Sequence, residues 1–292
     1  LDVRELTFEV NPDDVNAIFL QDLHSLGVTR LSMGVQTFQA DFLAFMNRAH
    51  SREEALNCME LLQASAFDSY TVDLIYGNPN QSLEELNSDL DLLLGFNPPH
   101  VSAYSLTIEP ETRLGKQVEL GRIAPPEDDK VADHFDLIND RLKAQGIERY
   151  EVSNYSRRGC EAVHNRSYWR HRNYLGLGPA AHSFWWNQKA VRWEQQRNLR
   201  AYLRGEDIRS DPESLTMKQL AEERLMMGLR TREGVTTEEL DKRYDYRLNK
   251  RQTSYLEARE EEQKVRFDAC IQLTDKGIQI ADAIILDLIT LH

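Results

Sequence analysis

The chain has 292 residues, 41% of them hydrophobic and 28% charged, which is typical of a globular protein with a substantial core. Its 35 Lys and Arg against 48 Asp and Glu give a net charge of −13, which disfavours nucleic acid or an anionic membrane surface as the main partner. No apolar run approaches the roughly 20 residues of a membrane-spanning helix. The three cysteines, Cys58, Cys160 and Cys270, lie too far apart for a metal-ligand or disulfide pattern, so we expect a cytoplasmic protein.

The first half of the chain repeats a strand–helix unit, which predicts a parallel sheet with right-handed crossovers. Strand-like runs occupy residues 6–10, 30–36, 70–76 and 101–107. Helical periodicity lies between them, at residues 13–26, 39–49, 52–65 and 82–94. An open doubly wound sheet and a (β/α) barrel are both compatible with this order. The barrel is favoured because no glycine-rich phosphate loop follows any strand.

Polar side chains recur at or near the strand ends, where barrel enzymes build their sites. They are Glu9, Gln36, Asp73 and Thr107, and Arg48 lies one helix beyond Gln36. Each one alone is also compatible with an internally hydrogen-bonded barrel residue, since a buried polar group must be paired or bound. As a set, two acids, an amide and a guanidinium suit an amino acid joined to a ribose, because Arg binds a carboxylate in a bidentate fashion and acids accept from an ammonium or hydroxyls.

The second half is less regular. A helix is expected at residues 128–146 and a strand at 148–152, followed by a stretch rich in glycine and aromatic residues. A short helix leads to the polar segment 206–212, where we place the boundary between domains 1–205 and 206–292.

The C-terminal domain combines helices with a small hairpin, which predicts a winged-helix-like α+β fold. Helices are expected at residues 217–229, 237–244, 250–264 and 276–291, and a strand pair within 265–273. Acidic residues Glu257, Glu260, Glu261 and Glu262 load the longest helix, so a packing or partner role is favoured over DNA binding.

Five motifs occur in one order along the chain. They are Glu-Val-Asn-Pro at 9–12, Arg-Leu-Ser-Met-Gly-Val-Gln-Thr-Phe at 30–38, Asn-Arg-Ala-His at 47–50, Val-Asp-Leu-Ile-Tyr-Gly-Asn-Pro at 72–79 and Ser-Ala-Tyr-Ser-Leu-Thr-Ile-Glu-Pro at 102–110. In these the chain resembles the radical S-adenosylmethionine enzymes of the oxygen-independent coproporphyrinogen III oxidase family. The resemblance implies a partial TIM-like barrel. It also implies S-adenosylmethionine contacts from Glu9, Gln36, Arg48 and Asp73, to which we add Thr107 at the next strand end.

A further motif, His-Asn-Arg-Ser-Tyr-Trp at residues 164–169, is similar to the His-Asn-x-x-Tyr-Trp motif of the HemW-type haem chaperones. The resemblance implies haem contacts from His164, Asn165, Tyr168 and Trp169. An imidazole is a standard axial ligand of haem iron, and aromatic rings stack on a porphyrin. His182 is a second candidate ligand. The alternative is an aromatic cluster that closes the barrel rim. Five neighbouring arginines carry positive charges that suit the two propionates of haem: Arg157, Arg158, Arg166, Arg170 and Arg172.

Two elements of the family are missing from the sequence: the Cys-x-x-x-Cys-x-x-Cys loop that holds a [4Fe–4S] cluster, and a Gly-Gly-Gly-Thr-Pro motif. Cys58, in a predicted helix, cannot replace the loop. We therefore expect a fragment that lacks the first two strand–helix units and leaves the strand of Glu9 as an open edge. The fragment alone is expected to bind S-adenosylmethionine weakly and to perform no radical chemistry.

The resemblance implies that the intact protein binds haem and transfers it to an acceptor protein. One alternative is the oxidase itself, which decarboxylates coproporphyrinogen III by a radical mechanism, and the discriminating motif is the one at residues 164–169. A second alternative is a stand-alone binding module. The sequence leaves open the identity of the acceptor and whether the protein forms a homodimer.

Overall fold

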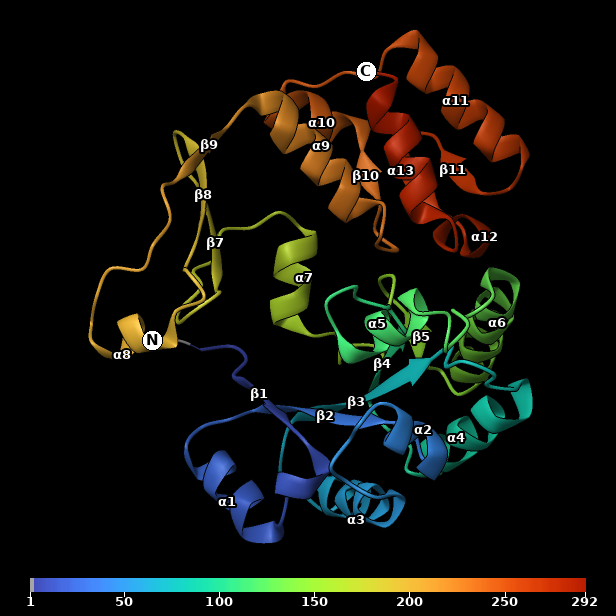
Figure 1. Cartoon of the computed structure of the whole chain (residues 1–292). Helices are drawn as coiled ribbons and strands as arrows, with labels where there is room; N and C mark the ends of the chain where they lie inside the picture. Colours follow the sequence, from blue (N-terminus) through green and yellow to red (C-terminus); the bar gives the residue numbers. More distant parts are fainter. Residues whose placement is uncertain (1–2) are drawn as a thin grey trace. The chain divides into compact units, whose positions relative to one another are not determined.

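A computed structural model of the chain describes residues 3–292 (Figure 1). The chain divides into two compact units, Leu1–Glu161 and Ala162–His292. This division differs from the expected boundary at residues 205 and 206. Two residues shortly after Ala162 are bonded to the C-terminal part of the chain: Arg170 pairs with Glu233 and His171 with Tyr244.

The first unit contains a six-stranded sheet in the order β1-β2-β3-β4-β6-β5. The four predicted parallel strands are confirmed, and β1 is an edge strand of the sheet. Their bounds are β1 (Thr7–Val10), β2 (Arg30–Gln36), β3 (Ser69–Tyr76) and β4 (His100–Ser105). Parallel strands followed along the chain by helices form the TIM-like half of the fold.

The single strand expected at residues 148–152 is wrong. The chain forms β5 (Glu148–Arg149), turns, and returns as β6 (Asn154–Ser156), which pairs antiparallel with both β5 and β4. The turn is stabilised by Glu151, whose carboxylate accepts a hydrogen bond from the Ser153 backbone N–H at 3.0 Å and another from the Asn154 side chain. Glu151, which was expected inside the strand, therefore stabilises the turn that follows β5.

The helices of the first unit begin largely where side chains cap them. The Ser51 hydroxyl accepts from the Glu54 N–H, and the Glu54 carboxylate accepts from the Ser51 N–H, which is a capping box that Ser82 and Glu85 repeat. The helix expected at residues 13–26 is split, because Asn16 interrupts it and caps the second part. The bounds are η1 (Pro12–Asp14), α1 (Ala17–Ser25), α2 (Ala40–Phe45), α3 (Arg52–Gln63), α4 (Leu83–Gly95), α5 (Arg113–Glu119) and α6 (Asp128–Ala144).

The two faces of the parallel strands differ in chemistry. Side chains alternate along a strand, so Leu31, Met33, Val72 and Leu74 share one face, where all four are fully buried. Helices α1 and α3 lie against one side of the sheet (Figure 1). The opposite face is polar, although parallel strands are usually apolar on both faces. Its residues include Glu9, Arg30, Ser32, Thr71, Asp73, His100, Ser102 and Asn154.

The second unit begins with α7 (Val163–Trp169) and an antiparallel sheet of β7 (His182–Trp186), β8 (Ala190–Glu194) and β9 (Glu213–Leu215), with α8 (Leu199–Leu203) between β8 and β9. The predicted winged-helix-like arrangement follows, with five helices and a three-stranded sheet in the order β10-β12-β11. Its bounds are α9 (Met217–Gly228), β10 (Val235–Thr236), α10 (Thr237–Tyr244), α11 (Lys250–Glu261), β11 (Val265–Phe267), β12 (Cys270–Leu273), α12 (Asp275–Ile278) and α13 (Ala281–Thr290).

The last predicted helix is broken. The segment expected as one helix forms α12 and α13, which are separated at Gln279 and Ile280. The helix α11 also ends three residues early, because Lys264 follows a left-handed Gln263 and leads into β11. Within residues 3–292, no helix has the length and apolar character needed to cross a membrane.

Candidate functional site

Asp73 lies in the middle of the polar face, on β3. The Ser32 hydroxyl of the neighbouring strand donates a hydrogen bond to its Oδ2 atom at 3.2 Å. Burial raises the pKa of the Asp73 carboxyl to about 6, against the opposing effects of the nearby Ser102 and Ser32 hydroxyls and the Arg30 guanidinium. Its other oxygen, Oδ1, is buried without a hydrogen-bond partner in the described part of the chain. Such a group either carries an uncompensated desolvation cost or binds a ligand.

Two further predicted site residues lie beside Asp73. Glu9 is exposed on β1, opposite Ser32, and its negative charge contributes to the raised pKa of Asp73. Gln36 ends β2 with a φ of +70°, and its side chain folds back over Gly34. A Cβ atom at Gly34 would lie 2.8 Å from Gln36 Nε2, so a larger residue there would require this amide to shift. The structure therefore brings Glu9, Gln36 and Asp73 to one face of the sheet.

Arg48 and Thr107 lie farther out, in loops that follow α2 and β4, and both are exposed. The loop of Arg48 is attached to β2, since the His50 ring bonds the Val35 carbonyl through Nε2 at 3.0 Å. Thr107 donates only to the nearby Ser105 carbonyl, at 3.5 Å. No hydrogen bond or ion pair described in the structure joins Arg48 or Thr107 to the group around Asp73.

A buried hydrogen-bonded chain on the same polar face was not predicted from the sequence. Thr71 Oγ1 lies 3.2 Å from Ser102 Oγ and 2.5 Å from His100 Nδ1, and His100 Nε2 lies 2.8 Å from the Tyr150 hydroxyl. Burial and the Arg30 charge lower the pKa of His100 well below its usual range, so the ring is neutral. The available signal was the alternation of polar residues along β3 and β4, at Thr71 and Asp73 and at His100 and Ser102.

The donors present do not fit an iron–sulfur cluster. In residues 3–292 no three His, Cys, Asp or Glu side chains gather in a way that would hold a metal ion. Cys58 is buried in α3, its Sγ donates to the Pro12 carbonyl at 3.0 Å, and burial raises its pKa to about 11. A thiolate ligand needs the opposite shift.

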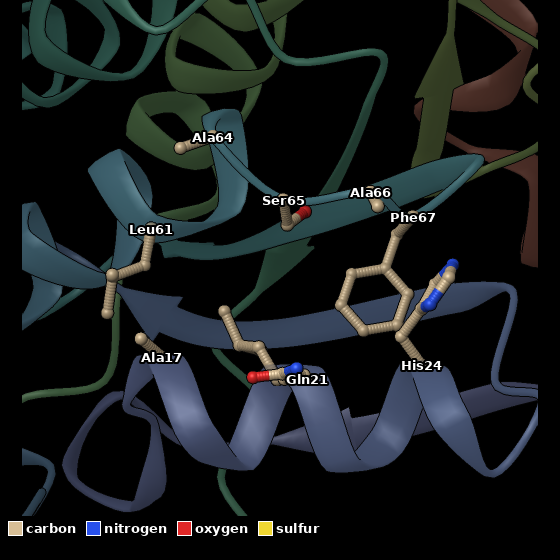
Figure 2. Close-up of a pocket in the computed structure, with 9 residues that line it drawn as sticks. Ala17, Gln21, His24, Leu61, Ala64, Ser65, Ala66 and Phe67 are labelled. Atoms are coloured by element: carbon tan, nitrogen blue, oxygen red, sulfur yellow. The ribbon is translucent and has the colours of Figure 1, made fainter.

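A surface cavity of about 260 Å³ lies elsewhere on the first unit (Figure 2). Ala17, Gln21 and His24 of α1 line one side, and the end of α3 with Phe67 lines the other. The His24 and Phe67 rings meet edge to face with centroids 5.7 Å apart. The cavity shares no residue with the predicted site and is mostly apolar, so we assign it no part in the site.

The second predicted site lies on α7, which the sequence analysis did not recognise as a helix. At about 100° per residue, His164, Asn165, Tyr168 and Trp169 fall within an arc of about 140° on one side of this helix. His164 and Tyr168 are exposed. The His164 and Tyr168 rings meet edge to face at 4.7 Å, and Tyr168 meets Tyr174 in the same way at 4.6 Å. The motif residues thus form a continuous side of one helix, and its aromatic row is extended by Tyr174.

Two of the five arginines, Arg166 and Arg170, lie on the other side of this helix. Arg166 and Arg170 lie about 200° and 240° around the helix from His164, on the opposite side, where both pair with Glu233 at 2.6 Å. Arg157 belongs to the first unit and donates to the Gln145 carbonyl and the Asn97 side chain. The expectation that these arginines attract propionates together is therefore wrong for Arg166 and Arg170, because their guanidinium groups already share one carboxylate.

His182, the second candidate ligand, begins β7. It is exposed, and its Nε2 lies 3.7 Å from Glu194 Oε2 on β8. No described ring contact joins it to His164 or Tyr168. The buried imidazole of the unit is His171, which stacks between Phe184 and Tyr244 at 4.7 and 5.8 Å and bonds the Tyr244 hydroxyl at 3.1 Å.

Comparison with known proteins identifies the class. Residues 1–93 match the model of the radical SAM superfamily, and residues 215–280 match that of the HemN C-terminal domain. The solved structure of coproporphyrinogen III oxidase (HemN) from Escherichia coli, described as a radical SAM enzyme, superposes with a TM-score of 0.80 at 21% identity. That match covers 99% of this chain and 70% of the other. The fold is therefore a radical SAM fold with a HemN-type C-terminal domain.

The chain is 32% identical over 286 residues to the heme chaperone HemW of Lactococcus lactis, which covers 96% of this chain and 74% of that protein. It is 32% identical over 250 residues to the heme chaperone HemW of Bacillus subtilis, which covers 85% of this chain and 66% of that protein. The chain belongs to the HemW family, as predicted from the motif at residues 164–169. It spans about two thirds to three quarters of the length of these two relatives.

Proposed function

We propose that this chain is part of a haem chaperone, which binds haem and transfers it to an acceptor protein in the cytoplasm. The observation that carries the proposal is the common side of α7 on which His164, Asn165, Tyr168 and Trp169 lie, with His164 and Tyr168 exposed. An exposed imidazole beside exposed aromatic rings suits a large flat ligand that must be taken up and released. The names of the relatives support the same ligand.

In this proposal His164 is the axial ligand of the haem iron, and Tyr168 and Trp169 contact the porphyrin. The edge-to-face contact with Tyr168 restricts the orientation of the His164 ring without covering it. Asn165, on the same side, is the candidate hydrogen-bond partner for a polar group of haem.

A haem titration tests this assignment. Ferric haem is added to the whole chain, and the Soret band is followed for the wild type, His164→Ala and His182→Ala. His182 is the matched control, because it is an exposed histidine in the same unit. We expect a Soret band that weakens in His164→Ala and is unchanged in His182→Ala. Unchanged binding in His164→Ala would show that this imidazole is not the ligand, and loss only in His182→Ala would move the ligand to β7.

We further propose that Glu9, Gln36, Arg48, Asp73 and Thr107 belong to an S-adenosylmethionine site of the intact protein. The buried, unpartnered Oδ1 of Asp73 and the Gln36 amide that lies over Gly34 support it, because both offer polar atoms to a ligand held near the strand ends. Acids and an amide accept from and donate to ribose hydroxyls and an ammonium, and Arg48 offers a fork for a carboxylate. When bound, S-adenosylmethionine would supply a methionine and an adenosyl group. The residues of this chain would bind and orient that ligand.

Calorimetric titration with S-adenosylmethionine tests this second site. We expect weak binding by the wild-type chain, and weaker binding by Glu9→Gln and Asp73→Asn. Asp91→Asn is the control, since Asp91 is an exposed acid on α4 that pairs with Arg141. Equal affinities for the wild type and Asp73→Asn would remove Asp73 from the site.

A further inference from the structure

The helix α7 lacks the usual sources of stability for an isolated helix. It has seven residues, none of them buried, and its N-cap residue is Ala162, whose side chain cannot cap. Helices shorter than about 12 residues are not stable in water without tertiary contacts. The side of α7 that carries His164 and Tyr168 is exposed, so we look to the opposite side and the helix end for contacts that fix its orientation.

On the opposite side, the carboxylate of Glu233 binds two arginines of the helix. Glu233 Oε1 lies 2.6 Å from Arg166 Nη2 and 2.6 Å from Arg170 Nη2, and its Oε2 accepts from Arg170 Nε at 3.0 Å. Arg170 therefore binds it through two parallel hydrogen bonds, the strongest geometry for this pair. These bonds, Arg170 first, lower the pKa of Glu233 to about 2.

The C-terminal end of α7 is held by two more arginines. Arg224 donates to the Trp169 carbonyl at 3.3 Å, and Arg243 donates to the His171 carbonyl at 3.1 Å. Arg224 is itself buried and bound in a bidentate fashion by Glu239, with both N–O distances 2.9 Å. Carbonyl groups at a helix end need donors, and cations there also complement the helix dipole.

The turn that carries Glu233 is fixed to the winged-helix-like sheet. The Glu233 carbonyl accepts from the Gln272 side chain of β12 at 3.3 Å. The next residue, Gly234, has a φ of +69°, and a Cβ atom there would lie 2.3 Å from the Ile271 carbonyl oxygen. The carboxylate is therefore presented from a backbone that has little room to move.

We propose that Glu233 is a positioning residue for haem binding: by pairing with Arg166 and Arg170 it holds α7 to the winged-helix-like domain and keeps the His164 side open. The inference rests on the proposed haem function and extends it, because it gives that domain a role in presenting the ligand. Glu233 does not compete with haem, since the paired arginines and His164 lie on opposite sides of α7. Its effect on haem is transmitted through the orientation of the helix.

The test measures haem affinity and the Soret wavelength for Glu233→Gln, for the charge swap Glu233→Arg with Arg170→Glu, and for the control Asp282→Asn. Asp282, on α13, pairs with Arg230 at 2.6 Å in the same unit. We expect Glu233→Gln to weaken haem binding about tenfold, an ordinary coupling between two sites, and to shift the Soret band. The charge swap should recover part of the affinity, and Asp282→Asn should match the wild type.

The milder variant Arg166→Gln leaves the Arg170 pair in place and should lose less affinity than Glu233→Gln, which keeps the test usable if Glu233→Gln folds poorly. Wild-type affinity and spectrum in Glu233→Gln, with loss in His164→Ala, would overturn the positioning role and leave the haem assignment standing. Equal losses in Asp282→Asn and Glu233→Gln would also overturn it, since the effect would then be general destabilisation. A wild-type chain without a Soret band would overturn both proposals.

Discussion

The polar face of the sheet and the exposed side of α7 depart from the usual distribution of residues in opposite ways. On the sheet, a carboxylate is placed among buried strands with Oδ1 of Asp73 unpartnered. On α7, a histidine and a tyrosine are left exposed. The first arrangement costs folding free energy, because a buried charge must be compensated. The second costs little, because exposed aromatic residues lose no contacts that the fold needs.

This difference teaches how each candidate site is to be probed. Substitutions in the sheet should change stability and ligand binding together, in opposite directions, since the strained group is also the binding group. Substitutions on the exposed side of α7 should change ligand binding with little effect on stability. Substitutions of residues that support α7 from behind, such as Arg224 and Gly228, should lower both the stability and the ligand affinity.

The largest effect on the free energy of unfolding is expected for Asp73→Asn. Asp73 has a pKa of about 6 in the folded protein, above its ordinary value of 3.8, so its stabilising contribution is complete below pH 3.8 and is lost as the pH rises through 6. At roughly 1.4 kcal/mol per pKa unit, the variant should be about 3 kcal/mol more stable than the wild type at pH 8 and equal to it near pH 4. Urea unfolding at both pH values measures this. A variant less stable than the wild type at pH 8 would show that interactions in the folded protein compensate the buried Asp73 carboxylate. The polar face of the sheet would then not differ from the exposed side of α7 in its cost to folding.

A somewhat smaller effect on the free energy of unfolding is expected for Gly228→Ala, in the helix whose Arg224 donates to α7. A Cβ atom at Gly228, the last residue of α9, would lie 2.2 Å from both Arg224 Nη1 and Val235 Cγ2. Overpacking of this kind costs about 1–3 kcal/mol, and it should displace the arginine that donates to Trp169. Thermal unfolding and haem titration should both report a loss. Unchanged haem affinity in a destabilised Gly228→Ala would separate the support of α7 from ligand binding.

Tyr168→Ala tests the exposed side directly. Tyr168 is 36% exposed and makes edge-to-face contacts with His164 and Tyr174. Each such pair contributes about 1 kcal/mol, so the loss of two pairs should lower the free energy of unfolding by about 2 kcal/mol, while haem affinity falls clearly. Tyr202→Ala, at another exposed tyrosine of the same unit, is the control. A large stability loss in Tyr168→Ala would instead favour the aromatic-cluster interpretation.

The smallest expected effect is the loss of stability as the pH is lowered. The pKa of Glu233 is lowered from 4.5 to about 2, so its contribution to stability is complete above pH 4.5 and is lost as the pH falls toward 2. Half of its side chain is exposed, so solvent weakens the effect. Between pH 5 and pH 3 the wild type should lose slightly more stability than Glu233→Gln. Parallel curves for the two proteins would show that the pairing with Arg166 and Arg170 contributes nothing measurable.

Much of the first unit was predictable, because its signals are local. The capping boxes at Ser51 and Ser82 follow from local Ser-x-x-Glu patterns, since a cap satisfies donors within three residues of itself. The alternation along β3 carried enough information to find Asp73 and, in retrospect, the Thr71 and His100 chain. The strands and their parallel order followed from the same period-two and helical patterns.

The sequence by itself determined the strand–helix order, the winged-helix-like C-terminal arrangement and the family motifs, because these depend on neighbours a few residues apart. Only the tertiary structure decided that residues 148–156 form a hairpin and that α7 is a helix with two opposed sides. It alone revealed that Arg166 and Arg170 bind Glu233, 63 residues beyond Arg170. Those features depend on the long-range contacts that offset the conformational entropy of short segments, and no local pattern encodes which distant carboxylate a guanidinium will meet.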